Sequence, residues 1–272
     1  MPPHLTVVGS VNLDLVARTE RLPRPGETVT GATFTQVPGG KGANQALAAA
    51  RLGATVSLVA CVGDDDHARA ALAELERAGV DLTHLKRSAQ PTGVALITVD
   101  AAGENEIVVA PGANADLRPE DLNLPDCDAV LCQLEIPLDT VEAAADTASS
   151  DFYLNAAPAK AGAPAADLTI VNRFELEALT HRDGLLAVTD GAAGAVLLDG
   201  GVEVARATPP KVDAVDGTGA GDAFTACLVV SLLEGRERTE ALRRACIAGA
   251  LAASTFGAQT SLPTAEEVDR LL

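Results

Sequence analysis

The sequence contains few aromatic residues. Only 2% of its 272 residues are aromatic: five phenylalanines, one tyrosine and no tryptophan. Aromatic rings supply the stacking surfaces on which planar ligands are held. A small molecule bound by this chain must therefore be held mainly by polar contacts.

Cysteine and histidine are too sparse and too scattered for a disulfide framework or a zinc site. The five cysteines are odd in number and form no C-x-x-C pair, and the four histidines lack the spacing of metal ligands. We expect reduced, largely buried thiols in a cytoplasmic protein.

Basic residues and long apolar runs are also scarce. There are 20 Lys and Arg residues against 38 Asp and Glu residues, which gives a formal net charge of −18. This charge repels nucleic acid and excludes it as an extended partner. No apolar run is long enough to span a membrane, so no membrane partner is expected. A strand-like run at residues 5–8 begins almost at once, without the basic and apolar regions of a secretion signal.

Short apolar, β-branched runs alternate with longer runs rich in alanine and leucine. The expected strands cover residues 5–8, 55–60, 129–133, 152–155 and 168–171. The expected helices cover residues 42–52, 68–78, 138–148, 219–233 and 239–255. This alternation predicts an α/β fold with a mostly parallel central sheet and helices on both faces.

Two stretches without neighbouring helices break this pattern. Residues 26–37 alternate and are rich in threonine, and residues 92–109 indicate two strands joined by a turn at residues 101–104. We expect lid strands from about 15–38 and 92–110, projecting from a single domain of residues 1–272. The alternative is a pair of edge hairpins packed on the core. Exposed edges of a lid sheet favour pairing with a second copy, which predicts a homodimer.

The segment D-G-T-G-A-G-D-A-F at residues 216–224 precedes a long apolar helix. Glycine lets the backbone approach a ligand closely, and a helix start offers unpaired N–H groups and the positive end of the dipole. Residues 219–221 can thus form an anion hole for a phosphate in transfer, while Asp222 accepts the proton of the attacking hydroxyl. The structural alternative makes Thr218 the N-cap and Asp222 a first-turn acid. Two aspartates around three glycines favour the catalytic interpretation.

A second glycine-rich segment, G-G-K-G-A-N-Q at residues 39–45, opens another helix. It is not a Walker loop, because no Ser or Thr follows Lys41 and the spacing differs. Asn44 is placed to face a bound polyol. The alternative is a flexible helix start with a surface lysine.

Polar side chains also follow three of the expected strands. Asn12 and Asp14 follow the first, Glu135 follows the third, and Asn172 with Glu175 follows the last. Ligands of open parallel sheets bind beyond the carboxyl ends of the strands. Each group alone is an ordinary polar turn, whereas together they indicate a binding site.

Five segments together resemble the PfkB carbohydrate kinase family, and its ribokinase branch in particular. They are G-S-x-N-x-D near the N-terminus, G-G-K-G-A-N-Q, N-x-x-E at residues 172–175, D-G-T-G-A-G-D-A-F, and the tail G-A-Q-T-S-L-P. They occur in the order of the family and span nearly the whole chain. The resemblance implies a ribokinase-like fold that uses ATP, Mg²⁺ and K⁺ to phosphorylate the 5-hydroxymethyl group of D-ribose.

The resemblance also implies residue roles, position by position. The sugar would be held by Asn12, Asp14, Gly39, Gly40, Lys41, Asn44, Glu135 and Asp222. Asp222 would be the catalytic base, with an anion hole of Gly219, Ala220 and Gly221. The nucleotide would be bound by Asn172, Thr189, Asp190, Gly191, Ala192, Ala193, Gly194, Gly221 and Cys246. Glu175 would act at Mg²⁺, and the K⁺ site would consist of Asp216, Thr218, Ala252, Thr255, Gly257 and Ser261.

The sequence departs from the family in two places near the nucleotide. Residues 176–188 replace a longer segment that includes a helix, so apolar surface is expected to be exposed there. Cys246 stands where the family often has asparagine.

Fructose, deoxyribose and nucleosides are alternative acceptors, although Phe34 is the one aromatic residue of the lid available to stack on a base. A sugar-binding protein without catalysis is the alternative from another class, and the retained Asp222 disfavours it.

Overall fold

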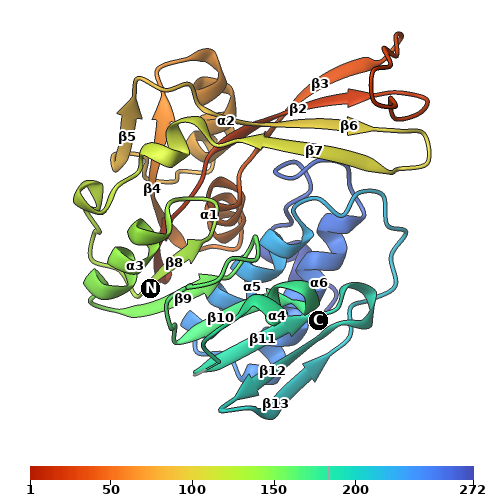
Figure 1. The fold of residues 1–272 in the computed structure, drawn as a ribbon. Coiled ribbons are helices and arrows are strands. Elements are labelled where there is room, and N and C mark those ends of the chain that lie inside the picture. The colour runs from red at the N-terminus through yellow and green to blue at the C-terminus, as the bar shows by residue number, and fades with distance from the viewer. Residues whose placement is uncertain (183) are drawn as a thin grey trace.

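A computed structural model describes residues 1–182 and 184–272 and shows two sheets and the helices around the larger one (Figure 1). The large sheet has nine strands in the order β13 (Val202–Ala207), β12 (Ala195–Asp199), β11 (Leu185–Thr189), β10 (Leu168–Asn172), β9 (Asp151–Asn155), β8 (Ala129–Gln133), β1 (His4–Val8), β4 (Thr55–Gly63) and β5 (Leu85–Ser88). The strands from β5 to β11 are parallel, and β12 and β13 run antiparallel at one edge. The predicted mostly parallel sheet is confirmed.

Helices cover both faces of this sheet, as predicted. One core cluster joins the sheet to α1 (Lys41–Arg51), α2 (Asp66–Arg77), α5 (Ala220–Leu233), α6 (Arg238–Ala253) and α7 (Ala265–Asp269). A second cluster joins the opposite face to α3 (Leu138–Thr147) and α4 (Arg173–Ala178). Adjacent residues of β1 point to different clusters: Val7 belongs to the first and Val8 to the second, and both are fully buried. This two-sided burial explains why the central strands are continuous apolar runs.

The small sheet has the strand order β3 (Thr33–Gly39), β2 (Asn12–Arg18), β6 (Gly93–Val99) and β7 (Asn105–Ala110). It extends from the large sheet above the ends of α5 and α6 (Figure 1). The predicted pair of strands around residues 101–104 is confirmed, because β6 and β7 pair antiparallel across that turn. The strand expected from residue 26 begins only at Thr33. Residues 12–14, for which a polar turn was the alternative interpretation, begin β2, so that the lid strand expected from about residue 15 starts at Asn12.

Apolar side chains differ in exposure around the short segment at residues 176–188. Leu176 and Leu179, within it, are partly buried against the second core cluster. Phe174 of α4, just before the segment, is 83% exposed. Among the described residues, no helix is both long and apolar enough to cross a bilayer.

Candidate functional site

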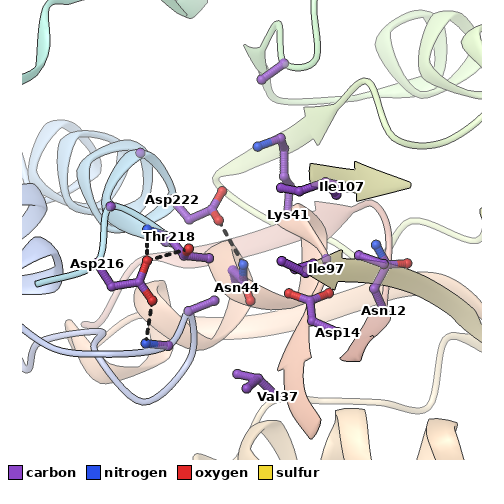
Figure 2. A pocket seen from close by; sticks show the side chains of 18 of the residues that line it. Asn12, Asp14, Val37, Lys41, Asn44, Ile97, Ile107, Asp216, Thr218 and Asp222 are labelled. Carbon is purple, nitrogen blue, oxygen red and sulfur yellow. Dashed lines mark hydrogen bonds between the residues drawn. The ribbon is translucent and has the colours of Figure 1, made fainter. Parts of the chain in front are cut away.

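A cleft of about 570 Å³ lies between the small sheet and the carboxyl ends of the central strands. Figure 2 shows Asn12, Asp14, Lys41, Asn44, Asp216, Thr218 and Asp222 around it. Aliphatic side chains of the small sheet, Val16, Ile97, Val99, Ile107 and Val109, also line it. The cleft thus combines a polar floor with a partly apolar wall, as small-molecule sites commonly do.

The G-G-K-G segment allows α1 to begin against the junction of β1 and β2. A Cβ atom at Gly42 would lie 2.5 Å from the backbone nitrogen of Ser10, and one at Gly40 would lie 2.7 Å from that of Asn12. Gly40 also has a φ of 88°, which disfavours any other residue. The two glycines therefore bring the start of α1 next to Asn12.

Glu135 is anchored to this helix start. Its Oε2 atom accepts hydrogen bonds from the Ser10 hydroxyl at 2.6 Å and from the Lys41 backbone N–H at 2.9 Å. An acceptor at this place stabilises the helix N-terminus. Glu135 lines the cleft but is also part of the framework that holds α1.

Asn12 and Asp14 are two residues apart on β2 and both line the cleft. Asn12 is held by Asn114, whose Nδ2 donates to Asn12 Oδ1 at 2.8 Å and to the Val11 carbonyl at 3.1 Å. Close packing also surrounds Asp14, since a Cβ atom at Gly39 would lie 2.6 Å from both of its carboxylate oxygens. Asn12 and Asp14 therefore point to the same side of β2 and into the cleft, as their spacing predicted.

Asp14 carries a strongly perturbed carboxyl group. Burial raises its pKa to about 7, with the neighbouring carboxylates of Glu135 and Asp222 acting in the same direction and Lys41 opposing them. Asp14 is 9% exposed. Its proton therefore leaves near neutral pH.

Asp222 lies in the first turn of α5, with both carboxylate oxygens held by amides of α1. Asn44 Nδ2 donates to Oδ2 at 2.9 Å, and Gln45 Nε2 donates to Oδ1 at 2.8 Å (Figure 2 shows the first bond). Burial raises the pKa of Asp222, while Lys41 and the two amides oppose this rise. Lys41 is surrounded by carboxylates, and that of Asp222 is the largest cause of its raised pKa.

The start of α5 leaves backbone donors open. Gly219 adopts a left-handed conformation, with φ of 78°, immediately before the helix. Within residues 1–182 and 184–272, the N–H groups of Gly221 and Asp222 make no hydrogen bond, whereas that of Ala220 donates to the Gly217 carbonyl at 3.3 Å. Such open donors at a helix N-terminus are suited to an anion.

Asp216 joins the loop before α5 to the loop after α6. Its Oδ1 accepts from the Thr218 backbone and hydroxyl at 3.0 and 2.7 Å, and its Oδ2 accepts from the Gly257 N–H at 3.0 Å. The Ala253 carbonyl accepts from the N–H groups of Val215 and Asp216. The two segments predicted to share a cation are therefore in contact, through the Asp216 carboxylate and the Ala253 carbonyl.

The N-x-x-E segment forms a reciprocal cap at the start of α4. Asn172 Oδ1 accepts from the Phe174 and Glu175 N–H groups, and Glu175 Oε2 accepts from the Asn172 N–H at 2.8 Å. Burial raises the pKa of Glu175. Both residues line the cleft, with one oxygen of Glu175 not used by the cap.

Most of the remaining residues predicted to bind nucleotide lie beyond the cleft. Thr189 lines the cleft, but residues 190–194 and Cys246 do not. Cys246 is buried in α6, where its Sγ faces the Ala207 carbonyl at 3.7 Å, and burial raises its pKa to about 11. Of the K⁺ residues, Ala252, Thr255 and Ser261 also lie outside the cleft, below its loops.

Several site residues escaped prediction. They are Asn114, which holds the Asn12 side chain, the buried amides Gln45, Gln133 and Asn155, and the aliphatic residues of the small sheet. Gln45 belongs to a motif that we recognised, but the motif alone does not show where its side chain points. For Gln133 and Asn155, a polar residue at the end of an otherwise apolar strand was the available signal.

Known proteins of one family resemble this chain over nearly its whole length. A model of the pfkB family of carbohydrate kinases matches residues 2–265. Ribokinase from Bacillus subtilis is 39% identical over 294 aligned positions, which cover 99% of this chain and 99% of that protein.

Solved structures show the same fold. A ribokinase from Thermotoga maritima superposes with a TM-score of 0.91 at 32% identity, covering 98% of each chain. Arabidopsis thaliana ribokinase, solved in complex with ribose and ATP, superposes with a TM-score of 0.87 at 31% identity, covering 100% of this chain and 99% of the other.

Proposed function

Because this chain belongs to the pfkB family of carbohydrate kinases, we propose that it transfers the γ-phosphoryl group of ATP to the 5-hydroxyl of D-ribose. The chain is a kinase whose acceptor is a sugar hydroxyl. The observation that carries the proposal is the position of Asp222. This buried carboxylate faces the cleft from the first turn of α5, where backbone N–H groups have no hydrogen-bond acceptor among the described residues.

The polar floor of the cleft supports a sugar acceptor. Asn12, Asp14 and Asn44 bring amide and carboxylate groups together, with Glu135 and Lys41 beside them. Asn44 Oδ1 is buried and has no hydrogen-bond partner among the described residues, so a ring hydroxyl would satisfy it. The aliphatic wall from β6 and β7 would cover the apolar face of the ring and exclude water.

Asp222 would act as the general base for transfer. Its carboxylate would accept the proton of the 5-hydroxyl as the oxygen attacks the γ-phosphorus. The N–H groups of residues 219–221 would stabilise the charge on the transferring phosphoryl oxygens. The open donors of Gly221 and Asp222 support this role, and the longer bond of Ala220 would have to yield.

Glu175 and Asn172 would act on the phosphate side of the cleft. Among the described residues, no group of three His, Cys, Asp or Glu side chains could by itself enclose a metal ion. Mg²⁺ bound to ATP commonly keeps its water molecules and takes only one or two carboxylates. Glu175, with one oxygen free of the cap, fits that requirement, and the bound ion would neutralise phosphate charge. Thr189 and residues 190–194 would border the nucleotide.

The experiment that tests the acceptor is an assay of ADP formation with ribose, deoxyribose, fructose and a nucleoside. Buried polar groups reject analogues that leave them unpaired. We therefore expect the highest kcat/KM with ribose. Equal kcat/KM for ribose and fructose would contradict the ribose assignment and leave the kinase intact. Sugar binding without any ADP formation would instead indicate a binding protein.

Asp216 and its neighbours would hold a monovalent cation. Asp216 and Thr218 lie in the loop before α5, whereas Thr255, Gly257 and Ser261 follow α6 and Ala252 lies in its last turn. A bound K⁺ would fix residues 219–221 in place without touching either substrate. We expect turnover to be several-fold higher in potassium than in a bulky organic cation at equal ionic strength. Identical rates in the two salts would remove the cation from this account.

The small sheet also supports the proposed homodimer. Its exposed apolar residues include Phe34, Leu96 and Val108, and all residues of the edge strand β7 are exposed. An open, apolar edge strand favours pairing with another chain.

All five cysteines are free, which supports a reducing, cytoplasmic setting.

A further inference from the structure

Four buried amide and carboxylate side chains form a continuous hydrogen-bonded chain beneath the cleft. Gln133 Nε2 donates to Gln45 Oε1 at 2.7 Å, and Gln45 Nε2 donates to Asp222 Oδ1 at 2.8 Å and to Asn155 Oδ1 at 2.9 Å. Gln45 and Gln133 are completely buried, and Asn155 and Asp222 nearly so. The members come from α1, β8, β9 and α5, so the chain forms only in the folded protein.

The direction of every bond in this chain follows from one backbone group. Asn155 Nδ2 donates to the Ile170 carbonyl at 3.1 Å. A backbone carbonyl can only accept, so Asn155 must turn its oxygen toward Gln45. Gln45 then presents its NH₂ group to Asn155 and to Asp222, and its oxygen to Gln133. Both hydrogens of this NH₂ group are used, and one of them is directed at the carboxylate.

Gln133 holds the other end of Gln45 in a tightly packed place. A Cβ atom at Gly9 would lie 2.1 Å from Gln133 Oε1, so the glycine makes room for this side chain. If Gln133 turned over, its oxygen would face the oxygen of Gln45. The bond to Gln45 therefore favours a single orientation, in which Gln133 Oε1 is buried without a hydrogen-bond partner among the described residues.

We propose that Gln45 is a positioning residue for phosphoryl transfer, which Gln133 and Asn155 hold with its NH₂ group on Asp222. The proposal rests on Asp222 as the base of the proposed kinase. Gln45 contacts the Asp222 carboxylate but does not line the cleft, whereas Asn44 holds the other carboxylate oxygen and also lines the cleft. The amide keeps Asp222 ionised and aimed while burial acts against its charge.

Other charged groups face Asp222 from the neighbouring elements and are left unchanged by the test. They are Lys41 of α1, Asp14 of β2, Glu135 after β8 and Glu175 of α4. The substitutions therefore have to remove one amide donor without changing these charges. Methionine meets this requirement, since it has the length of glutamine and no N–H group.

The experiment compares Gln45→Met, Gln133→Met and the double variant. Loss of a hydrogen bond to a charged group lowers the equilibrium or rate constant that depends on it by about tenfold or more. We expect Gln45→Met to lower kcat about tenfold or more, to leave the KM for ribose nearly unchanged, and to move the acid limb of the kcat profile up by about one pH unit. Gln133→Met should act in the same direction by a smaller factor. Because Gln133 acts through Gln45, the double variant should be no worse than Gln45→Met.

A second readout does not depend on the acceptor. Carbon NMR of the Asp222 carboxyl, assigned with Asp222→Asn, should show a higher pKa in Gln45→Met than in the wild type. Gln259→Met replaces another completely buried glutamine, whose side chain makes no hydrogen bond to any residue that the structure describes, and should leave this titration unchanged.

An unchanged Asp222 titration in Gln45→Met would overturn the proposal, and so would additive losses in the double variant. A wild-type enzyme without ribose turnover would contradict the proposed acceptor instead, and the carboxyl titration would still decide the role of Gln45.

Discussion

Replacement of Asp222 by asparagine is expected to lower kcat by about 10²–10⁴-fold, the usual effect of losing a general base. Asparagine has the shape of aspartate but cannot accept the proton of the attacking hydroxyl. The amide oxygen of asparagine can still accept from the Gln45 NH₂ group, which preserves one of the two hydrogen bonds at this side chain, so the fold should be retained. Turnover measured with saturating ribose, ATP and Mg²⁺ checks this expectation.

The matched measurement for this variant is ribose binding by calorimetry. Asn12, Asp14 and Asn44 would hold the sugar with Asp222→Asn much as in the wild type, so the Kd should change little. If the variant kept more than about half of the wild-type turnover, Asp222 would not be the base. A large loss of ribose affinity with unchanged kcat would make it a binding residue instead.

The KM for ribose is expected to fall about tenfold between pH 6 and pH 8. The pKa of Asp14 is about 7 in the folded protein, against 3.8 for an unperturbed Asp. An ionised carboxylate accepts hydroxyl hydrogen bonds more strongly than the protonated acid does. Affinity should therefore rise as Asp14 loses its proton.

The raised pKa of Asp14 also makes the free energy of unfolding fall as pH rises from about 4 to about 7, because only the folded chain keeps the proton in that range.

Asp14→Asn is the matched variant for this pH dependence. It keeps the size of the side chain and removes the titration, so the KM should become nearly independent of pH. Loss of a charged acceptor should lower kcat/KM about 10- to 100-fold at pH 8. A KM that still fell tenfold in Asp14→Asn would assign the titration to another group.

Much of the fold was predictable because its strands and helices bury regular patterns. The residues of β8 are those expected, and β1, β4, β9 and β10 begin or end within a few residues of their predicted limits. Their apolar runs are continuous because both faces of the central sheet are covered by helices. The same reasoning located α5 and α6, most of whose residues are buried.

The first residues of β2 were not predictable as a strand, although the lid expected from about residue 15 includes the rest of it. Its first half presents Asn12 and Asp14 to the cleft, so it contains polar residues where a core strand has apolar ones. Its partners explain why it is a strand: it pairs with β3 on one side and β6 on the other. Those contacts join segments far apart in the sequence, which local patterns do not report.

The outline of the site was predictable, but its supports were not. The motifs named Asp14, Asn44 and Asp222, and the structure brings all three to one cleft. The hydrogen bonds that hold Asp222 and Asn12 come from Gln45 and Asn114 across long sequence separations. No spacing along the chain reveals such partners, because they depend on how α1, α5 and β2 pack together.

Phosphorus NMR of a reaction containing D-ribose, ATP, Mg²⁺ and K⁺ tests the central claim most directly, because it identifies the phosphorylated atom. The account predicts ADP and one new phosphomonoester signal, split by the two hydrogens on C5 of ribose. Inorganic phosphate as the sole new product, or a phosphate coupled to the hydrogen on C1, would contradict it.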